Sequence, residues 1–369
     1  MKLMKTTEAV GQVLCHDITQ IIPGVKKDAV FRKGHIITKE DIPVLLSVGK
    51  DTIYIWENDE TMMHENEAAE VLYRMSACGT NCNEADAEGH CEATQSGDLD
   101  DIVSKMHPSP VKEGKIEVIA DCDGLLKVDS EKLKKVNSFG EMMIATRHGN
   151  TTVKKGDKLA GTRIIPLVIK KDKLEAASHI CDDGPILDIK PFVVRKAAII
   201  TTGNEVYHGR IQDAFTPVIE KKIAEFGAQM MFHEMFDDDD QKITDGCLRA
   251  IEAGAEIVFC TGGMSVDPDD KTPLAIKNTG ARIVSYGSPV LPGAMFLLSY
   301  YDAGDRLVPI CGLPGCAMYN KRTIFDIVLP RLMACDMILA DELAGLGEGG
   351  LCLNCDVCTF PNCGFGKGF

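Results

Sequence analysis

The fold is decided between residues 197 and 335, where the chain reads AAIITTGNE (197–205), IVFCTGGMS (257–265) and LVPICGLPG (307–315). Each stretch is a short, nearly continuous apolar run that ends in a glycine-centred loop. Such runs are typical of parallel strands that are buried on both faces of a sheet. Because parallel strands end at the same edge, we expect the three loops to form one rim.

The rim has the chemistry of an anion-binding site. Glycine allows backbone N–H groups to approach a ligand closely and tolerates positive φ, and a following helix N-terminus adds partial positive charge. The alternative is that the glycines are ordinary turn residues. Three such loops in one segment, two of them beside acidic residues, favour a site for a phosphate-bearing ligand.

Helical patterns separate the apolar runs. One begins at Thr216 and Pro217 and ends at Gly227, and a second precedes Gly254. Their apolar positions recur at helical spacing: Val218 or Ile219, Ile223 and Phe226 in the first, and Ile243, Cys247, Leu248 and Ile251 in the second. The predicted fold class is therefore α/β, a doubly wound three-layer sandwich with its ligand at the carboxyl edge of the sheet.

Five motifs occur in a recognisable order: TGNEVYHGRIQD (202–213), MFDDDDQ (235–241), CTGGMSVDPDD (260–270), LPGAM (291–295) and GLPGCAM (312–318). This order resembles the molybdopterin-binding domain shared by the bacterial molybdenum-insertion enzyme, its adenylating partner and their fused eukaryotic counterpart. The resemblance spans about 140 of the 369 residues. Several separated motifs at compatible spacing make it specific.

The resemblance implies particular site residues. Glu205 and Asp270 would be catalytic, and Glu205 with Asp237 or Asp238 would hold Mg2+, a hard cation that prefers carboxylate and phosphate oxygens. An alternative for the acidic run 237–240 is a solvated helix start, where carboxylates favour the helix dipole. The residues expected to cradle molybdopterin, or its adenylylated form, are Thr202, Gly203, Asn204, Gly262, Gly263, Ser265, Pro314 and Gly315.

Three departures from the family pattern bear on the chemistry. Asn204 stands where the insertion enzyme typically has aspartate, Asp267 where it usually has glycine, and Cys316-Ala317 where Asn-Pro often follows. The glycines and backbone N–H groups remain, so pterin binding is the safer expectation. The three changes bear on the geometry of the metal site and hence on molybdate insertion.

Three functions remain open. The first is insertion of molybdate into adenylylated molybdopterin with release of AMP. The second is a non-catalytic carrier or maturation factor that delivers the cofactor to a recipient molybdoenzyme. The third is a nucleotide hydrolase on the same fold. The resemblance also implies a homo-oligomer.

The last cysteines form a separate motif, Cys352-x2-Cys355-x2-Cys358-x4-Cys363, after a glycine-rich stretch. It is close to the ferredoxin run C-x2-C-x2-C-x3-C-P, although the last spacing is one residue longer. We expect a [4Fe-4S] cluster. Structural Zn2+ is the alternative, although four-cysteine zinc sites usually separate two CxxC pairs by a longer loop, and a segment without stable metal stays open.

The remaining chain suggests smaller units. We expect a β-rich unit at 1–60, a polar connector at 61–110, a β-rich accessory domain at 111–194, the binding domain at 195–336, and a linker with the cysteine tail at 337–369. The connector contains Cys78, Cys82 and Cys91, whose spacing matches no standard metal site.

Composition restricts the partners. The net charge is −15, with 45% hydrophobic and 26% charged residues. Nucleic acid and anionic membranes both attract basic surfaces, so neither is an expected partner. The sequence has no apolar stretch of membrane-spanning length and no signal-peptide core, which favours the cytoplasm and mostly reduced thiols for the 15 cysteines.

Overall fold

The structure is a computed structural model that describes residues 2–22, 26–55, 59–79, 105–265, 267 and 270–368. The chain divides into two compact units. The first comprises residues 1–121, 128–147 and 155–188, and the second comprises 122–127, 148–154 and 189–369. No helix in the described ranges is long and apolar enough to cross a membrane.

The first unit begins with a small β-rich region. Its apolar core contains Leu14, Ile18, Ile37 and Leu45. Strand β1 pairs antiparallel with β4, and β2 pairs with β3. The elements are β1 (Lys2–Lys5), β2 (Ile18–Ile22), β3 (Lys26–Phe31), α1 (Asp41–Ser47) and β4 (Thr52–Ile55).

The rest of the first unit is built on a four-stranded sheet in the order β6-β7-β11-β9. Helix α2 contacts β7 and β11. The elements are β5 (Met62–His64), α2 (Glu65–Ala77), β6 (Met106–Pro108), β7 (Lys115–Ala120), α3 (Ser130–Ser138), β9 (Met142–Thr146), β11 (Lys158–Ile164), β12 (Val168–Lys170) and α4 (Lys171–Ser178). Cys78, which follows α2, is disulfide-bonded, and Cys82 and Cys91 lie outside the described residues.

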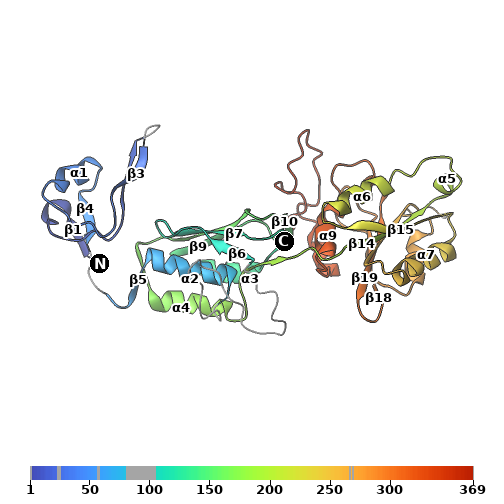
Figure 1. Cartoon of the computed structure of the whole chain (residues 1–369), viewed down its shortest axis with the longest axis horizontal. Coiled ribbons are helices and arrows are strands. Elements are labelled where there is room, and N and C mark those ends of the chain that lie inside the picture. The colour runs from blue at the N-terminus through green and yellow to red at the C-terminus, as the bar shows by residue number, and fades with distance from the viewer. Residues whose placement is uncertain are drawn as a thin grey trace. The chain divides into compact units, whose positions relative to one another are not determined.

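The second unit contains the predicted sandwich (Figure 1). Its six-stranded sheet has the order β15-β14-β16-β19-β18-β17. The first four strands are parallel. Strand β18 is antiparallel to both of its neighbours, so β17 at the edge again runs in the direction of the first four. The strands are β14 (Lys196–Thr202), β15 (Gln229–Phe236), β16 (Ile257–Thr261), β17 (Arg282–Tyr286), β18 (Leu297–Asp302) and β19 (Leu307–Leu313). The three expected parallel strands are confirmed as neighbours.

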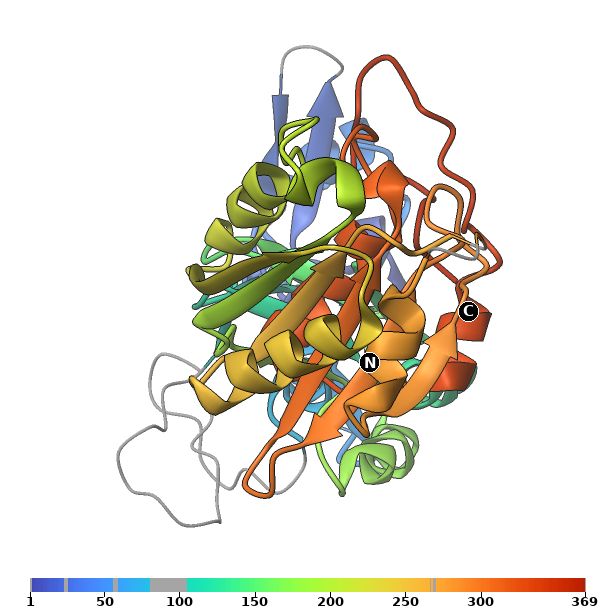
Figure 2. The same cartoon turned by 90° about the vertical axis from the view of Figure 1, so that its right-hand side faces the viewer.

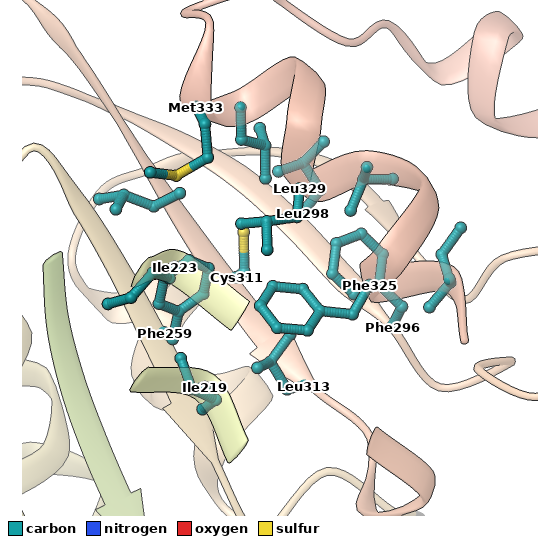
Figure 3. Close-up of a cluster of buried hydrophobic side chains, with 14 of the residues drawn as sticks. Ile219, Ile223, Phe259, Phe296, Leu298, Cys311, Leu313, Phe325, Leu329 and Met333 are labelled. Atoms are coloured by element: carbon teal, nitrogen blue, oxygen red, sulfur yellow. The ribbon is translucent and has the colours of Figure 1, made fainter. Parts of the chain in front are cut away.

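Helices cover both faces of this sheet (Figures 1 and 2). On one face, α6 and α9 pack against Ile199, Phe259 and Leu313, and Figure 3 shows these helices contributing Ile219, Ile223, Phe325, Leu329 and Met333. On the other face, α7 and α8 pack against Ile200 and Val258. The helices are α5 (Asn204–Tyr207), α6 (Thr216–Ala224), α7 (Asp240–Glu252), α8 (Thr272–Asn278), α9 (Ile324–Met333) and α10 (Ala340–Gly345). The predicted three-layer α/β fold is confirmed.

A smaller three-stranded sheet has the order β10-β8-β13, formed by β8 (Gly124–Val128), β10 (Thr151–Val153) and β13 (Leu187–Lys190). Asp336, which follows α9, accepts hydrogen bonds from Lys127 (2.8 Å) and Lys190 (2.6 Å) of this sheet. Nε of Arg331 donates a third hydrogen bond to the Asp336 carboxylate, at 2.6 Å. These cations fix the end of α9 to the small sheet.

Candidate functional site

Three parallel strands bring their loops to one edge. The register pairs Thr201 with Thr261, and Thr261 with Leu313. Strands β14, β16 and β19 therefore end together, because this register places their last residues beside one another. The glycine loops that follow leave the sheet side by side, as the sequence predicted.

The second loop presents backbone donors. Gly262 and Gly263 have φ of 83° and 54°, in the left-handed region that favours glycine. A Cβ on Gly262 would collide with the carbonyl oxygen of Thr202. The N–H groups of both glycines make no hydrogen bond within the described part of the chain. They are available to an anionic ligand.

The Thr202 hydroxyl has a structural position. It is buried, donates to the Thr261 carbonyl at 3.1 Å, and lies 2.9 Å from the hydroxyl of Thr272 at the start of α8. The first and second loops are therefore joined beneath the rim. The hydroxyl of Thr261 is also buried and has no partner among the residues that the structure describes.

A pocket of about 530 Å³ lies between the second and third loops. Gly315 has open space where a Cβ would project. The walls include two carboxylates, three methionines and two aromatic rings. The lining residues are Phe215, Gly262, Gly263, Met264, Ser265, Asp267, Asp270, Ala294, Met295, Pro314, Gly315, Cys316, Met318 and Tyr319.

Asp270 lies on the wall of this pocket, and its charge affects Tyr286. Burial raises the pKa of Tyr286, and the negative charge of Asp270 raises it further. The Tyr286 hydroxyl donates to the carbonyl of Met264 at 3.3 Å. The tyrosine therefore connects the end of β17 to the second loop beside Asp270.

The first loop lies at the same sheet edge, but none of Thr202 to Glu205 lines the pocket. Gly203, with φ of 128°, begins α5. Its N–H donates to the Phe236 carbonyl at 3.2 Å, and the N–H of Asn204 donates to Asp238 at 3.2 Å. Glu205 is exposed, and one of its carboxylate oxygens would be 3.6 Å from a Cβ on Gly203.

The acidic run 237–240 already has partners within the protein. Asp237 forms an ion pair with Lys242 at 2.8 Å, which raises the pKa of Lys242. The side chain of Asp239 caps α7 by accepting from the Lys242 N–H, and Asp240 accepts from Asn278 at 3.1 Å. Asp239 and Asp240 thus lie at a helix start, as one interpretation of the run expected. The metal role of Asp237 and Asp238 stays a prediction.

Metal ligation by the predicted acids and cysteines stays a prediction. Within the described ranges, no three His, Cys, Asp or Glu side chains are placed to hold one ion. Asp237 and Asp238 have the partners given above, and Glu205 does not line the pocket. The free cysteines Cys352, Cys355, Cys358 and Cys363 line a second pocket.

The sequence reasoning did not identify a polar network beside the first loop. Asp213 accepts hydrogen bonds from the N–H groups of Phe215 (2.8 Å) and Thr216 (3.2 Å) and from the Thr201 hydroxyl (3.1 Å). Burial alone would raise the pKa of Asp213, but these bonds hold it below its usual value. Asp213 is the last residue of the TGNEVYHGRIQD motif. The signal available in the sequence was an acidic residue shortly before Phe215 and the helix start at Thr216.

Other residues of the pocket wall were also absent from the predicted site: Phe215, Met264, Asp267, Ala294, Met295, Cys316, Met318 and Tyr319. Tyr319 is 76% exposed despite its large ring. Its position four residues after Gly315 was the only sequence signal available for it.

The architecture is a three-layer α/β domain with a glycine-lined pocket at its sheet edge. Residues 198–334 match the family described as "Probable molybdopterin binding domain", and residues 3–57 match a domain of unknown function. Residues 198–334 are thus a molybdopterin-binding domain of the type found in molybdenum-cofactor biosynthesis.

Curated relatives carry two kinds of name. A "Molybdopterin molybdenumtransferase" of Nostoc sp. is 23% identical over 197 residues, which cover 52% of this chain and 42% of the relative. A "Putative competence-damage inducible protein" of Bacillus subtilis is 30% identical over 88 residues, which cover 24% of this chain and 21% of the relative. The chain therefore spans less than half the length of these relatives.

A solved structure described as a tungsten cofactor synthesizing protein MoaB from Pyrococcus furiosus is 18% identical. The match covers 38% of this chain and 88% of that protein, with a TM-score of 0.30.

Proposed function

We propose that the pocket between the second and third loops binds adenylylated molybdopterin, and that the protein inserts molybdate into it with release of AMP. The observation that carries this proposal is that one pocket of about 530 Å³ is lined both by Asp270 and by Gly262 and Gly263, whose N–H groups have no partner among the residues that the structure describes. The site thus combines donors for phosphate oxygens with an acid suited to a metal-assisted reaction.

The glycine loops supply the phosphate contacts. Gly262 and Gly263 present N–H groups that make no hydrogen bond to any described residue, and the space at Gly315 lets the ligand approach the backbone. Since the chain carries a net charge of −15, local donors of this kind must offset the negative charge of the phosphates. Met264, Met295 and Phe215 offer apolar surface to the pterin ring.

Asp267 and Asp270 are the acids of the pocket wall. Magnesium is usually bound in proteins by one or two carboxylates together with substrate phosphates, so this pair fits the ion. Bound magnesium would neutralise phosphate charge while the phosphoanhydride is cleaved. Asp267, which departs from the glycine of the insertion enzyme, would then be a second ligand.

The carrier function remains a second candidate because of the acidic run. Asp237 is paired with Lys242, and Asp238 accepts from the Asn204 N–H. These acids are therefore engaged in the protein, and Asp270 with Asp267 would have to provide the metal ligation. If two carboxylates are insufficient for turnover, the same pocket would retain the pterin and pass it to a recipient molybdoenzyme.

The test is incubation of the full chain with adenylylated molybdopterin, Mg2+ and molybdate, with retained pterin and released AMP quantified over time. We expect many AMP molecules per chain from the wild type. Asp270→Asn should bind pterin but release AMP at least tenfold more slowly. Asp245→Asn is the matched control because Asp245 is exposed on α7 and does not line the pocket.

The alternatives predict different results. One retained pterin per chain without AMP turnover would establish a carrier. AMP formation from a nucleotide that lacks pterin would favour the hydrolase. Absence of both binding and turnover would refute the proposed function.

A further inference from the structure

The C-terminal segment 346–368 is packed onto the molybdopterin-binding domain. Phe365 is 5% exposed and belongs to the same core as Phe325 and Val328 of α9, and Phe360 packs against that core. Leu291 donates from its N–H to the Gly350 carbonyl at 2.8 Å, and its own carbonyl accepts from Cys352 at 2.8 Å. The domain therefore fixes where the cysteine motif begins.

The two ends of the segment meet. The N–H of Gly366 donates to the Gly349 carbonyl at 3.0 Å, and a Cβ on Gly349 would be 2.6 Å from the Gly364 carbonyl oxygen. A Cβ on Gly366 would be 2.7 Å from the side chain of Ile327 in α9. Glycines at both ends thus allow close backbone contact, and residues 350–365 form a closed loop.

This loop encloses a pocket of about 410 Å³ that is lined by Cys352, Cys355, Cys358 and Cys363. All four cysteines are free thiols. One water molecule requires roughly 10–15 Å³ of such space, so the pocket has room for a group of several atoms. Four thiols around one space of this size require an explanation other than core packing.

The surroundings suit an anionic group. Lys321 and Arg322 line the same pocket. The Arg322 guanidinium lies 5.0 Å from the centroid of the Phe360 ring, and Lys321 Nζ donates to the Asp356 carbonyl at 3.3 Å. Four thiolates around an iron–sulfur core carry net negative charge, which Lys321 would offset. Arg322 adds a second positive charge, although its guanidinium is also paired with Asp326 at 2.8 Å. Leu351, Leu353 and Phe365 supply the apolar part of the wall.

We propose that Cys352, Cys355, Cys358 and Cys363 bind a [4Fe-4S] cluster in this pocket. Each thiol loses its proton and forms one bond to an iron at a corner of the cluster. The two adjacent x2 spacings put three of the ligands close together in the sequence, between residues 352 and 358, as in the ferredoxin run. Zinc fits the arrangement less well because one ion needs its sulfurs at about 2.3 Å, and within the described ranges no three of these side chains are placed to hold a single ion.

The test is anaerobic purification of the full chain, followed by measurement of iron, acid-labile sulfide and zinc per chain. We expect about four irons and four sulfides, in accordance with the cluster composition, and an electron paramagnetic resonance signal after reduction with dithionite. Cys358→Ser and Cys355→Ser should each lose at least half of the iron. Cys335→Ser is the matched control because Cys335 is exposed and does not line the pocket.

Other results would overturn the proposal. One zinc per chain without sulfide would assign a mononuclear site, and a wild type without metal would remove the site altogether. Full iron and sulfide in both serine variants would exclude these ligands. Because the first measurement uses the wild type, the proposal is tested even if a serine variant does not fold.

Discussion

Gly262 lies against Thr202 so closely that a side chain on the glycine would collide with the threonine carbonyl oxygen. Thr202 ends β14 and Gly262 directly follows the neighbouring strand β16, although the two residues are 60 positions apart in the chain. This approach places the N–H groups of the second loop at the rim. The geometry of the proposed ligand site therefore depends on a contact that only glycine permits.

Replacing Gly262 with alanine tests this contact. Gly262→Ala must adopt a φ of 83° and also displace the Thr202 backbone, so we expect a loss of about 3 kcal/mol in the free energy of unfolding. Gly280→Ala is the control, because Gly280 has a φ of 85° but open space around its Cβ position. It should lose only about 1 kcal/mol. Equal losses in urea denaturation would show that the contact is unimportant.

Gly315 offers a change that separates binding from folding. A methyl group there meets no atom within 4 Å but enters the pocket. For Gly315→Ala we expect a free energy of unfolding within about 0.5 kcal/mol of the wild type. We expect pterin affinity to fall on the order of tenfold, which equals about 1.4 kcal/mol. Unchanged affinity in a direct binding titration would exclude the third loop from the site.

The position of Asp270 can be tested without any ligand. Because the charge of Asp270 helps to raise the pKa of Tyr286, Asp270→Asn should shift that pKa down towards its usual value. The tyrosinate absorbance change during a pH titration reports the shift, with Tyr286→Phe to assign the signal. Asp245→Asn should have no effect. An unchanged titration in Asp270→Asn would mean that the two side chains lie apart.

The lowered pKa of Asp336 predicts that the free energy of unfolding depends on pH. Burial would raise its pKa, but Lys127, Lys190 and Arg331 lower it to about 2. A carboxylate with a lowered pKa stabilises the fold above its unfolded pKa, near 4, and this stabilisation is lost as pH falls towards 2. Asp336→Asn should therefore cost about 2 kcal/mol at pH 7, by the same linkage.

Urea denaturation at a series of pH values measures this effect. The difference between wild type and Asp336→Asn should shrink below pH 4, whereas the control Asp305→Asn, at a 73% exposed carboxylate, should match the wild type throughout. A difference that is constant with pH would contradict the ionic explanation.

Much of the binding domain was predictable because its strands are buried on both faces. Unbroken apolar runs such as Ile257–Cys260 have few other interpretations, and the helices between them follow a clear period. Strand β15 was harder to recognise because it lies at the sheet edge, where its residues alternate between exposed and half-buried. Strands β17 and β18 were not predicted either. Strand β17 lies at the opposite sheet edge, where its residues are exposed or half-buried and form no unbroken apolar run.

The site was predictable in outline only. The loops carrying Gly262 and Gly315 line the pocket as expected, and so does Asp270. Asp237 resembles a metal ligand by its motif, yet its ion pair with Lys242 depends on how β15 leads into α7. Tyr319 and Phe215 reach the pocket from segments about 100 residues apart, and no local pattern indicates such a meeting.

The sequence by itself determined the α/β class, the order of the glycine loops and the cysteine spacing, since these follow from local periodicity and composition. Only the tertiary structure decided which loops line a common pocket and which acids are already paired. It also decided that the four tail cysteines line one pocket beside the hydrophobic core. The physical reason is that hydrophobic periodicity is encoded between near neighbours, whereas ligand geometry arises from strand register and from contacts between distant segments.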